Sequence, residues 1–183
     1  IYVARISRPE LGILGINRNL EYKIAQIAAD LEIGPQVRGY YPEELTLVID
    51  FIDGQTFGNQ ELKAHLSEIV QQCKTFHAGP LLPIDFDVFT VFRKYLDLAH
   101  FKRIELPQGF EEHLAAFSQI ENKFKENPVA LVACHNDLLA ANFIKSDDRI
   151  WIVDYEYAGN NDPAFELGNM WIEARLAEED LKN

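Results

Sequence analysis

Two periods of hydrophobic residues divide the chain into predicted strands and helices. Alternation with a period of two, which is typical of β-strands, covers three early segments: 1–7, 37–41 and 45–52. Residues 18–31 instead carry apolar side chains at helical spacing, and Asn17 or Asn19 can cap this helix. The pair Asp53-Gly54 then breaks the third strand. The pattern therefore predicts a small lobe of strands and one helix over residues 1–53.

Helical spacing dominates the remaining residues, 54–183, with a short insert of strands. Helices are predicted over 59–77, 88–98, 110–124 and 176–183, and a further helix begins at Pro163. Strands are predicted over 129–133, 142–144 and 149–153, the last two as a hairpin. These elements predict an α+β fold with two domains, residues 1–53 and residues 54–183. The chain opens on a strand without a Met and closes on a charged segment, so we expect it to be a piece of a longer protein.

One polar run between apolar segments carries the candidate chemistry. Residues 134–142 read Cys-His-Asn-Asp-Leu-Leu-Ala-Ala-Asn, and residues 151–157 read Trp-Ile-Val-Asp-Tyr-Glu-Tyr. The form His-x-Asp-x-x-x-x-Asn, followed by an Asp after a short apolar strand, is typical of phosphoryl transfer with a metal ion. Asp137 would orient the attacking hydroxyl, and Asn142 and Asp154 would hold Mg²⁺ through hard oxygen ligands. A polar turn after a buried strand is the alternative; the full run favours the catalytic interpretation.

His135 of this run and the two cysteines of the chain each allow more than one interpretation. His135 can be a catalytic acid or can form a structural hydrogen bond that orients the loop, and we favour the orienting role. Cys73 and Cys134 both stand in apolar segments. That position favours two buried free thiols over a disulfide.

Composition narrows the expected partners. Apolar residues make up 48% of the 183 residues, enough for a sizeable core, and the formal net charge is −12. Because no excess of cations exists to meet phosphates, neither nucleic acid nor an anionic membrane is an expected partner. An acidic surface tolerates a small cationic molecule instead. No signal peptide or membrane-length apolar run is recognisable, so we expect a cytoplasmic location, and the sequence leaves the oligomeric state open.

The two motifs, together with Asn161-Asp-Pro-Ala-Phe-Glu-Leu-Gly-Asn169 downstream, resemble the choline/ethanolamine kinase branch of the aminoglycoside phosphotransferase family. Glu166 stands where that family usually has Asp. The resemblance implies a protein-kinase-like two-lobed fold, with a truncated small α/β lobe and a mostly helical large lobe that has a short β-hairpin insert. It also implies an ATP- and Mg²⁺-dependent kinase that phosphorylates the hydroxyl of a small cationic amino alcohol, choline ahead of ethanolamine.

The resemblance implies further site residues in both lobes. Arg5 stands at the place of a strand cation that pairs with nucleotide phosphates, with Glu21 as its ion-pair partner; spacing alone would leave both as surface residues. Asp50 and Ile52 fall in the segment whose main chain contacts adenine. Four residues are implied on the substrate side: Glu156, Asn161, Trp171 and Glu173. Trp171 is also a candidate core residue, and its functional alternative is a cation–π contact with the ammonium group of the substrate.

Two parts that this family uses are expected outside the chain. A glycine-rich loop over the phosphates would precede Ile1, because Gly12 and Gly15 follow the Arg5 strand and read as a turn. Aromatic residues that enclose the ammonium group would follow Asn183. The same catalytic loop serves aminoglycoside, thiamine and sugar kinases, which remain alternatives. The expected position of the glycine-rich loop leaves another alternative, a catalytically incomplete pseudokinase or ligand-binding module.

Overall fold

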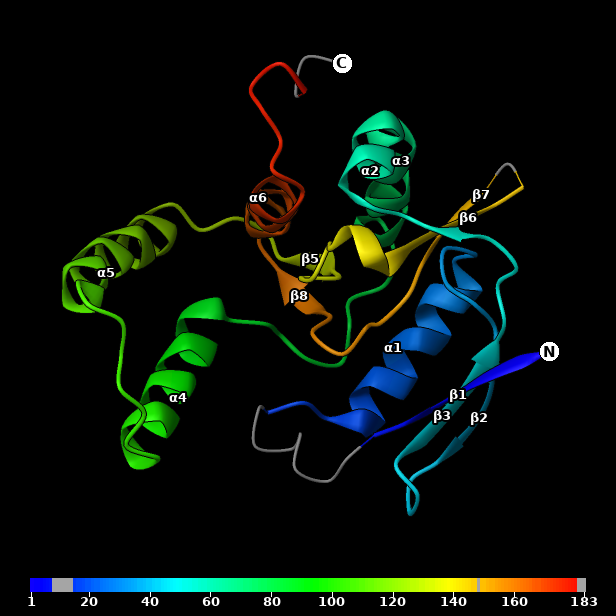
Figure 1. The fold of residues 1–183 in the computed structure, drawn as a ribbon, viewed down its shortest axis with the longest axis horizontal. Coiled ribbons are helices and arrows are strands. Elements are labelled where there is room, and N and C mark those ends of the chain that lie inside the picture. The colour runs from blue at the N-terminus through cyan, green and yellow to red at the C-terminus, as the bar shows by residue number, and fades with distance from the viewer. Residues whose placement is uncertain (8–14, 148, 181–183) are drawn as a thin grey trace. The chain divides into compact units, whose positions relative to one another are not determined.

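A computed structural model of the protein describes residues 1–7, 15–147 and 149–180, and it combines helices with small sheets in an α+β fold, as predicted (Figure 1). Contacts group the chain into two compact units. The first unit comprises Ile1–Phe86 and Leu131–Asn183, and the second unit comprises Asp87–Ala130. The lobe boundary at residue 53 falls within the first unit and stays a prediction.

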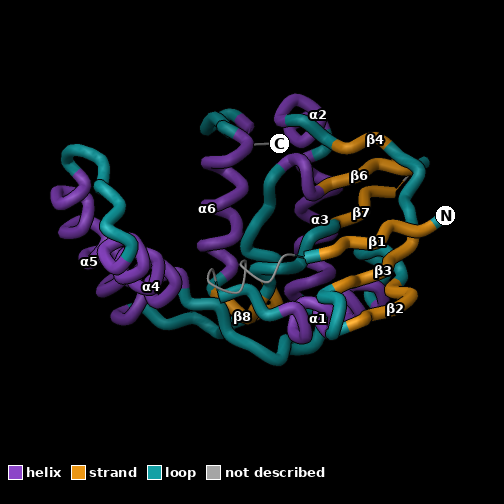
Figure 2. The backbone as a smooth tube through the Cα atoms, turned by 60° about the horizontal axis from the view of Figure 1, so that its bottom comes forward, coloured by secondary structure: helices purple, strands orange, loops and turns teal. Residues whose placement is uncertain are grey.

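A three-stranded antiparallel sheet and one helix form the N-terminal part of the first unit. The strands are β1 (Tyr2–Ile6), β2 (Val37–Tyr41) and β3 (Thr46–Asp50), in the order β1-β3-β2. Arg5 of β1 lies opposite Leu47 of β3. Helix α1 (Arg18–Asp30) lies beside this sheet (Figure 2), and the Asn17 side chain caps it by accepting two backbone N–H groups of its first turn. The three predicted strands and the first predicted helix are therefore present.

The helix predicted over residues 59–77 is in fact two helices. Helix α2 (Asn59–Ala64) ends at His65, and helix α3 (Leu66–His77) begins directly after it. The His65 ring stacks on Phe57 with ring centroids 5.2 Å apart, and its Nδ1 lies 2.7 Å from a carboxylate oxygen of Glu68. These contacts hold a backbone turn that contains neither Pro nor Gly. The hydrophobic period alone therefore could not predict the break.

Two smaller sheets carry the polar run of the sequence. Strand β5 (Val132–Cys134) pairs with β8 (Gly159–Asn161), and the hairpin of β6 (Phe143–Ser146) and β7 (Arg149–Ile152) extends through β6 to β4 (Gln55–Thr56). The predicted hairpin is present, but Asn142 belongs to a 3₁₀ turn, η2 (Ala140–Asn142), just before it. Strands β4 and β8 were not predicted, because a two-residue strand and the run Gly-Asn-Asn carry no strand pattern.

Helix α6 (Pro163–Ala174) begins at Pro163, as predicted. Arg175 then adopts a left-handed backbone conformation, with φ of 53°, which ends the helix. The carboxylate of Asp180 accepts the N–H of Ala177 at 2.7 Å, and residues 176–180 form no α-helix. The prediction of a helix over 176–183 is therefore wrong for the part that the structure describes, and residues 181–183 lie outside it.

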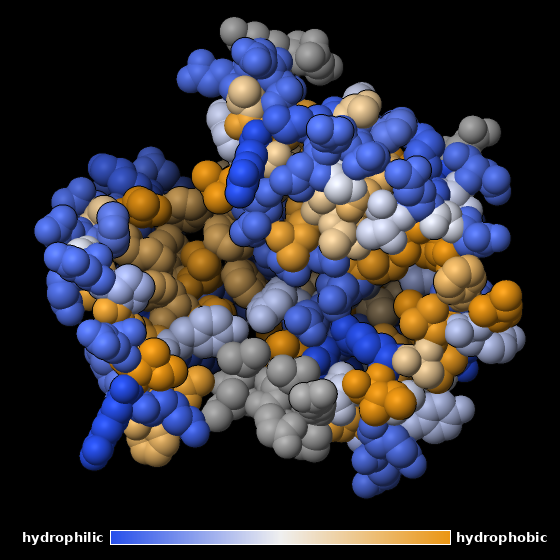
Figure 3. Space-filling model, in the orientation of Figure 1, coloured by the Kyte–Doolittle hydropathy of each residue, from blue (hydrophilic) through white to orange (hydrophobic). Residues whose placement is uncertain are grey.

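The hydrophobic core of the first unit is built from α1, α2, α3 and α6 together with the small sheets. Gly34 permits a close approach within it, since a Cβ there would lie 2.9 Å from the Tyr155 hydroxyl. Both Cys73 and Cys134 are buried free thiols, as predicted. Hydrophilic side chains cover much of the face shown in Figure 3. Among the described residues, no helix has the length and apolar character that a bilayer span requires.

The second unit is a pair of helices with its own aromatic cluster. Helix α4 (Val88–Phe101) and helix α5 (Phe110–Glu126) each run slightly longer than predicted. Phe92 and Phe117 pack with ring centroids 4.2 Å apart. Arg93 and Lys125 both pair with the carboxylate of Glu121, and the Lys125 contact is 2.7 Å. The Phe92–Phe117 and Arg93–Glu121 contacts thus join the two helices, and the Lys125–Glu121 pair stabilises α5.

Candidate functional site

The loop between β5 and β6 holds the central residues of the predicted site. Asn136, two residues after the end of β5, adopts a left-handed backbone conformation with φ of 64°. Asn is one of the few residues besides glycine that tolerate this conformation. Half-buried Asp137 follows this turn, and the turn directs the chain away from β5 toward η2.

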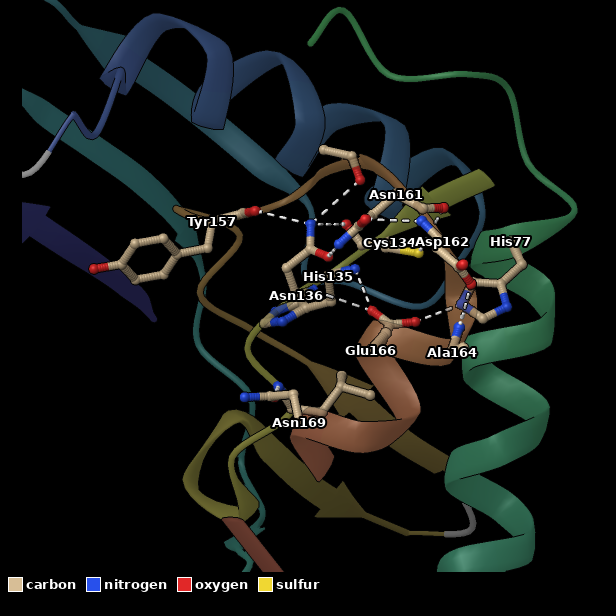
Figure 4. A network of polar contacts seen from close by, with 12 residues as sticks. His77, Cys134, His135, Asn136, Tyr157, Asn161, Asp162, Ala164, Glu166 and Asn169 are labelled. Carbon is tan, nitrogen blue, oxygen red and sulfur yellow. Dashed lines mark hydrogen bonds and ion pairs between the residues drawn. The ribbon is translucent and has the colours of Figure 1, made fainter. Parts of the chain in front are cut away.

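A buried carboxylate from helix α6 holds the start of this loop (Figure 4). Only 1% of Glu166 is exposed, and its Oε1 accepts the N–H groups of His135 and Asn136, the latter at 3.1 Å. Its Oε2 bonds to Nε2 of His77 at the end of α3. Hydrogen bonds to a carboxylate are stronger than those between neutral groups. Glu166 therefore ties the loop to two helices.

Amide side chains complete the support of the loop. Asn136 donates from Nδ2 to main-chain carbonyls within residues 157–159, at 3.0 and 3.3 Å, and its Oδ1 accepts from Asn161 at 2.8 Å. Asn169 of α6 accepts the N–H of Leu138 at 2.8 Å. The loop is thus held by the side chain of its own Asn136 and by three side chains that follow it in sequence. We call these four residues the loop anchor: Asn136, Asn161, Glu166 and Asn169.

The three residues predicted to carry the chemistry lie at one end of the hairpin. Asn142 donates from Nδ2 to the main-chain oxygen of Asp137 at 2.8 Å and to its Oδ2 at 3.2 Å. Val153 donates its N–H to the main-chain oxygen of Asn142 at 3.0 Å, and Asp154 comes next. The pairing register of the hairpin therefore brings Asp154 near Asn142, as expected for residues at the start and just after the end of the predicted hairpin.

Oxygen donors suited to a magnesium ion are present at this end of the hairpin. Because the nitrogen of the Asn142 amide is bonded to Asp137, its oxygen is the atom oriented to bind a cation. Asp154 adds a carboxylate and has a left-handed backbone with φ of 69°. An amide oxygen and a carboxylate are hard ligands, so the pair fits Mg²⁺.

Asp137 lies in an environment that disfavours its charge. Burial raises the pKa of Asp137 above the usual value for Asp, and the neighbouring carboxylates of Asp154 and Glu173 raise it further. The neighbouring His135 and the hydrogen bond from Asn142 lower the pKa of Asp137 and so act in the opposite direction. A carboxylate with a raised pKa accepts a proton more readily, which suits a group that orients a hydroxyl.

Five charged side chains form a connected group next to this hairpin end. We call them the ion cluster: Arg5, Arg18, Glu21, Asp154 and Glu156. Arg5 pairs with Glu21, as predicted, and its Nη1 lies 2.5 Å from Asp154 Oδ1 and 3.8 Å from Glu156 Oε2. Arg18 Nη1 lies 2.7 Å from Glu21 Oε2 and 3.0 Å from Glu156 Oε2. Burial lowers the pKa of Arg5, yet an arginine keeps its charge at neutral pH.

An apolar cavity of about 350 Å³ adjoins the ion cluster. Strands β1 and β3 line it together with the segment 50–52 and residues around the hairpin, and Arg5 and Asp154 both belong to its wall. The N–H of Asp50 donates to the Gln36 carbonyl at 2.9 Å, and its carboxylate pairs with an arginine of β2. A contact between Asp50 and a nucleotide base would therefore have to come from its carbonyl. Ile52 also lines the cavity, and its main-chain contact stays a prediction.

The four residues predicted on the substrate side take different positions. Glu173 is exposed on α6 and is near enough to Asp137 to affect its pKa, while Glu156 belongs to the ion cluster. The buried Asn161 amide is engaged at both ends, since its Oδ1 also accepts the N–H of Asp162 at 2.8 Å. Trp171 packs against the hydrophobic core, as the alternative for it implies. Substrate contacts of these residues stay predictions.

His135 is placed as an orienting residue. It is 1% exposed, its Nε2 lies 3.0 Å from the main-chain oxygen of Val153, and its ring meets Tyr155 edge-on at 5.0 Å. Its Nδ1 is buried and has no hydrogen-bond partner among the described residues. A ring enclosed in this way links the loop to the segment after β7, which favours the structural role over acid catalysis.

A second group of possible metal ligands lies behind the loop. Ligand atoms of His77, Cys134 and Glu166 lie within 4.8 Å of one another. Burial raises the pKa of the Cys134 thiol, which keeps it protonated, and both oxygens of Glu166 already accept hydrogen bonds. A thiolate is the form that binds metals. These groups therefore form a hydrogen-bonded support for the loop.

Comparison with known proteins identifies the family. The family described as Choline/ethanolamine kinase matches residues 1–181. The chain belongs to the choline/ethanolamine kinase family. Protein LicA of Haemophilus influenzae is 35% identical over 117 residues, which cover 62% of this chain and 43% of that protein. The chain spans less than half the length of the curated relatives that it matches.

Solved structures in the same family align with nearly all of the chain. A choline/ethanolamine kinase family protein from Mesorhizobium loti is 28% identical, with a TM-score of 0.84 over 98% of this chain and 60% of its own. Choline kinase LicA from Streptococcus pneumoniae is 24% identical, with a TM-score of 0.87 over 99% of this chain and 65% of its own. LicA has also been solved in complex with AMP. The predicted protein-kinase-like fold is confirmed by these neighbours.

Sequence reasoning missed Arg18 and gave no role to most of the loop anchor. An arginine at the first position of a helix departs from the preference for acidic residues there, and this departure could have drawn attention to it. Glu166 and Asn169 are polar residues three apart on a helix that is otherwise largely apolar, which is a weaker signal. The partners of Asn136 come from residues more than twenty positions away, and no local pattern predicts them.

Proposed function

We propose that the protein containing this chain is a kinase that transfers the γ-phosphoryl group of ATP, with Mg²⁺, to the hydroxyl of a small amino alcohol in the cytoplasm. Choline is the preferred acceptor and ethanolamine the next. One observation carries the proposal: Asp137, Asn142 and Asp154 gather at one end of the hairpin, beside a cavity that Arg5 also lines. Membership of the choline/ethanolamine kinase family supports the same reaction.

In this reaction the acceptor hydroxyl attacks the γ-phosphorus of ATP, and ADP leaves. Asp137 accepts the hydrogen bond of the hydroxyl and then its proton, which its raised pKa favours. Arg5 attracts the phosphates from the cavity wall. Asn142 and Asp154 would hold Mg²⁺, whose chemistry is to neutralise negative charge on the phosphates. The apolar cavity would take the base, beside the main chain of Asp50 and Ile52.

A cationic acceptor is favoured by the charges around Asp137. Glu173 is exposed near this residue and offers a carboxylate to an ammonium group. Glu156 adds another acidic group in the neighbouring ion cluster. The formal net charge of −12 favours the approach of a cation over that of an anion.

The test is an acceptor panel with the full-length protein that carries this chain, ATP and Mg²⁺. We expect transfer to choline and then ethanolamine, above thiamine, aminoglycosides and sugars. Asp137→Asn should lower the rate by about 10²–10⁴-fold, the usual contribution of a positioned base. Asp97→Asn, an exposed position on α4, makes the same charge change as a control.

Two outcomes would contradict the proposal. Transfer confined to another acceptor class would assign the chain to a different small-molecule kinase. Binding of ATP without transfer to any acceptor would favour a pseudokinase or ligand-binding module.

A further inference from the structure

Arg18 occupies a position where helices disfavour a positive charge. It is the first residue of α1, and the unpaired N–H groups of a first turn already carry partial positive charge. The side chain is nevertheless only 11% exposed, so it is not simply solvated. Departures from local preference in an otherwise regular element tend to occur at functional sites.

The partners of Arg18 connect α1 with the segment that carries Asp154. Its Nη1 lies 2.7 Å from Glu21 Oε2, one turn along the helix, and 3.0 Å from Glu156 Oε2. Glu156 stands two residues after Asp154 and 138 residues from Arg18 in sequence. Arg18 thus bridges the partner of Arg5 and the segment of the predicted metal ligand.

Arg18 also competes with Arg5 for the same oxygen. Glu156 Oε2 lies 3.0 Å from Arg18 and 3.8 Å from Arg5. The ion cluster holds two arginines and three carboxylates, hence a net charge of −1, and without Arg18 the net charge would be −2. Arg5 would then be the only cation of the cluster, facing Glu21, Asp154 and Glu156.

We propose that Arg18 is a positioning residue for nucleotide phosphates. By holding Glu156 and the second oxygen of Glu21, it keeps Glu156 from closing on Arg5, and Arg5 stays available to the phosphates of ATP. This inference rests on the proposed function, because it requires ATP to bind beside Arg5. Arg18 acts through Arg5 and does not itself contact the nucleotide.

The experiment measures binding of ATP and of adenosine to the full-length protein by calorimetry, without metal ion. Adenosine has no phosphates, so it reports on the base site alone. Arg18→Gln should weaken ATP binding about tenfold and leave adenosine binding unchanged. Lys23→Gln, an exposed position on the same helix, removes the same charge outside the cluster and should change neither affinity by more than about twofold.

A second substitution tests whether Glu156 mediates the effect. Adding Glu156→Gln to Arg18→Gln restores the net charge of the cluster to −1 and removes the carboxylate that would close on Arg5. The double variant should regain most of the ATP affinity, and Arg18→Lys should retain part of it because a cation remains.

Each contrary result has a definite meaning. Arg18→Gln with wild-type ATP affinity overturns the inference. Equal losses for ATP and adenosine show a merely structural role, and failure of the double variant to recover shows that Arg18 does not act through Glu156. A wild-type protein that binds adenosine as tightly as ATP and transfers no phosphate would instead contradict the proposed function itself.

Discussion

The loop anchor and the ion cluster hold neighbouring parts of the same site by different interactions. The anchor is buried: Glu166, Asn136 and Asn161 are 1%, 5% and 8% exposed, and they bond mainly to main-chain groups and to one another. The ion cluster is more open, since the side chains of Asp154 and Arg5 are 40% and 30% exposed. Its members are all charged, and Arg5 and Arg18 share the carboxylate of Glu156 as a partner.

This difference matches what the proposed phosphoryl transfer would require of each region. In that reaction the loop would have to hold Asp137 in one orientation, and buried hydrogen bonds are costly to break. The proposed reaction would require the cluster to change partners, because Arg5 and Asp154 pair with each other, whereas Arg5 would bind phosphate and Asp154 would bind the metal ion. Partly exposed ion pairs contribute only about 0–1 kcal/mol, so this exchange is inexpensive.

The largest expected effect comes from breaking the anchor at Glu166. Glu166→Ala leaves two buried N–H groups and His77 without their acceptor. We expect the free energy of unfolding to fall by about 2–5 kcal/mol and the transfer rate to fall by about 10²-fold, through misplacement of Asp137. Urea unfolding and steady-state kinetics measure the two effects.

Glu166→Gln is the matched variant for this prediction. It keeps an oxygen for the N–H groups of His135 and Asn136 and changes only the contact with His77. It should therefore lose much less stability and activity than the Ala variant. An Ala variant as stable and as active as the wild type would show that the anchor does not position the loop.

A smaller effect should appear when the charge of Asp137 is removed. Its pKa is raised in the folded state, so the folded protein binds this proton more tightly than the unfolded chain does. Ionisation of Asp137 therefore opposes folding, and the opposition develops as pH rises through the folded-state pKa. Asp137→Asn should raise the Tm of the nucleotide-free protein by about 2 °C near pH 7, with little change near pH 4.

The pH dependence separates this electrostatic effect from packing. Scanning calorimetry at both pH values on the wild type and the variant provides the measurement. A variant that is destabilised equally at both pH values would mean that the hydrogen bond from Asn142, and not the buried charge, dominates at this position.

Local sequence patterns were sufficient for the parts of the site that are continuous along the chain. The run 134–142 and the hairpin after it are such parts, because the register of a hairpin brings its start and end together. Arg5 and Glu21 were paired through the family resemblance and not through spacing. The left-handed turn at Asn136 depends on contacts with residues more than twenty positions away. The division of one helix at His65 depends on contacts of its ring with Phe57 and Glu68, which the hydrophobic period does not reveal.

The charged partners show the same limit. Arg18 reads as a helix-surface residue until Glu156, 138 positions away, is known to lie beside it. The family motif suggests a ligand contact for Asn161, which stays a prediction, but the hydrogen bonds of its buried amide to Asn136 and Asp162 were not foreseen. The burial of Arg18 and Asn161 is a property of the assembled fold.

The proposed function requires Asp154 to exchange its contact with Arg5 for a metal ion. Calorimetric titration of the full-length protein with ATP, with and without Mg²⁺, measures it in the wild type and in Asp154→Asn. Asn tolerates the left-handed backbone at this position. Asp147→Asn is the control, since Asp147 is exposed on the same hairpin and also has a positive φ, 52°.

We expect Mg²⁺ to tighten ATP binding at least about tenfold in the wild type and the control, and to have little effect in Asp154→Asn. Equal tightening by Mg²⁺ in all three proteins would contradict the assignment of Asp154 as the metal ligand.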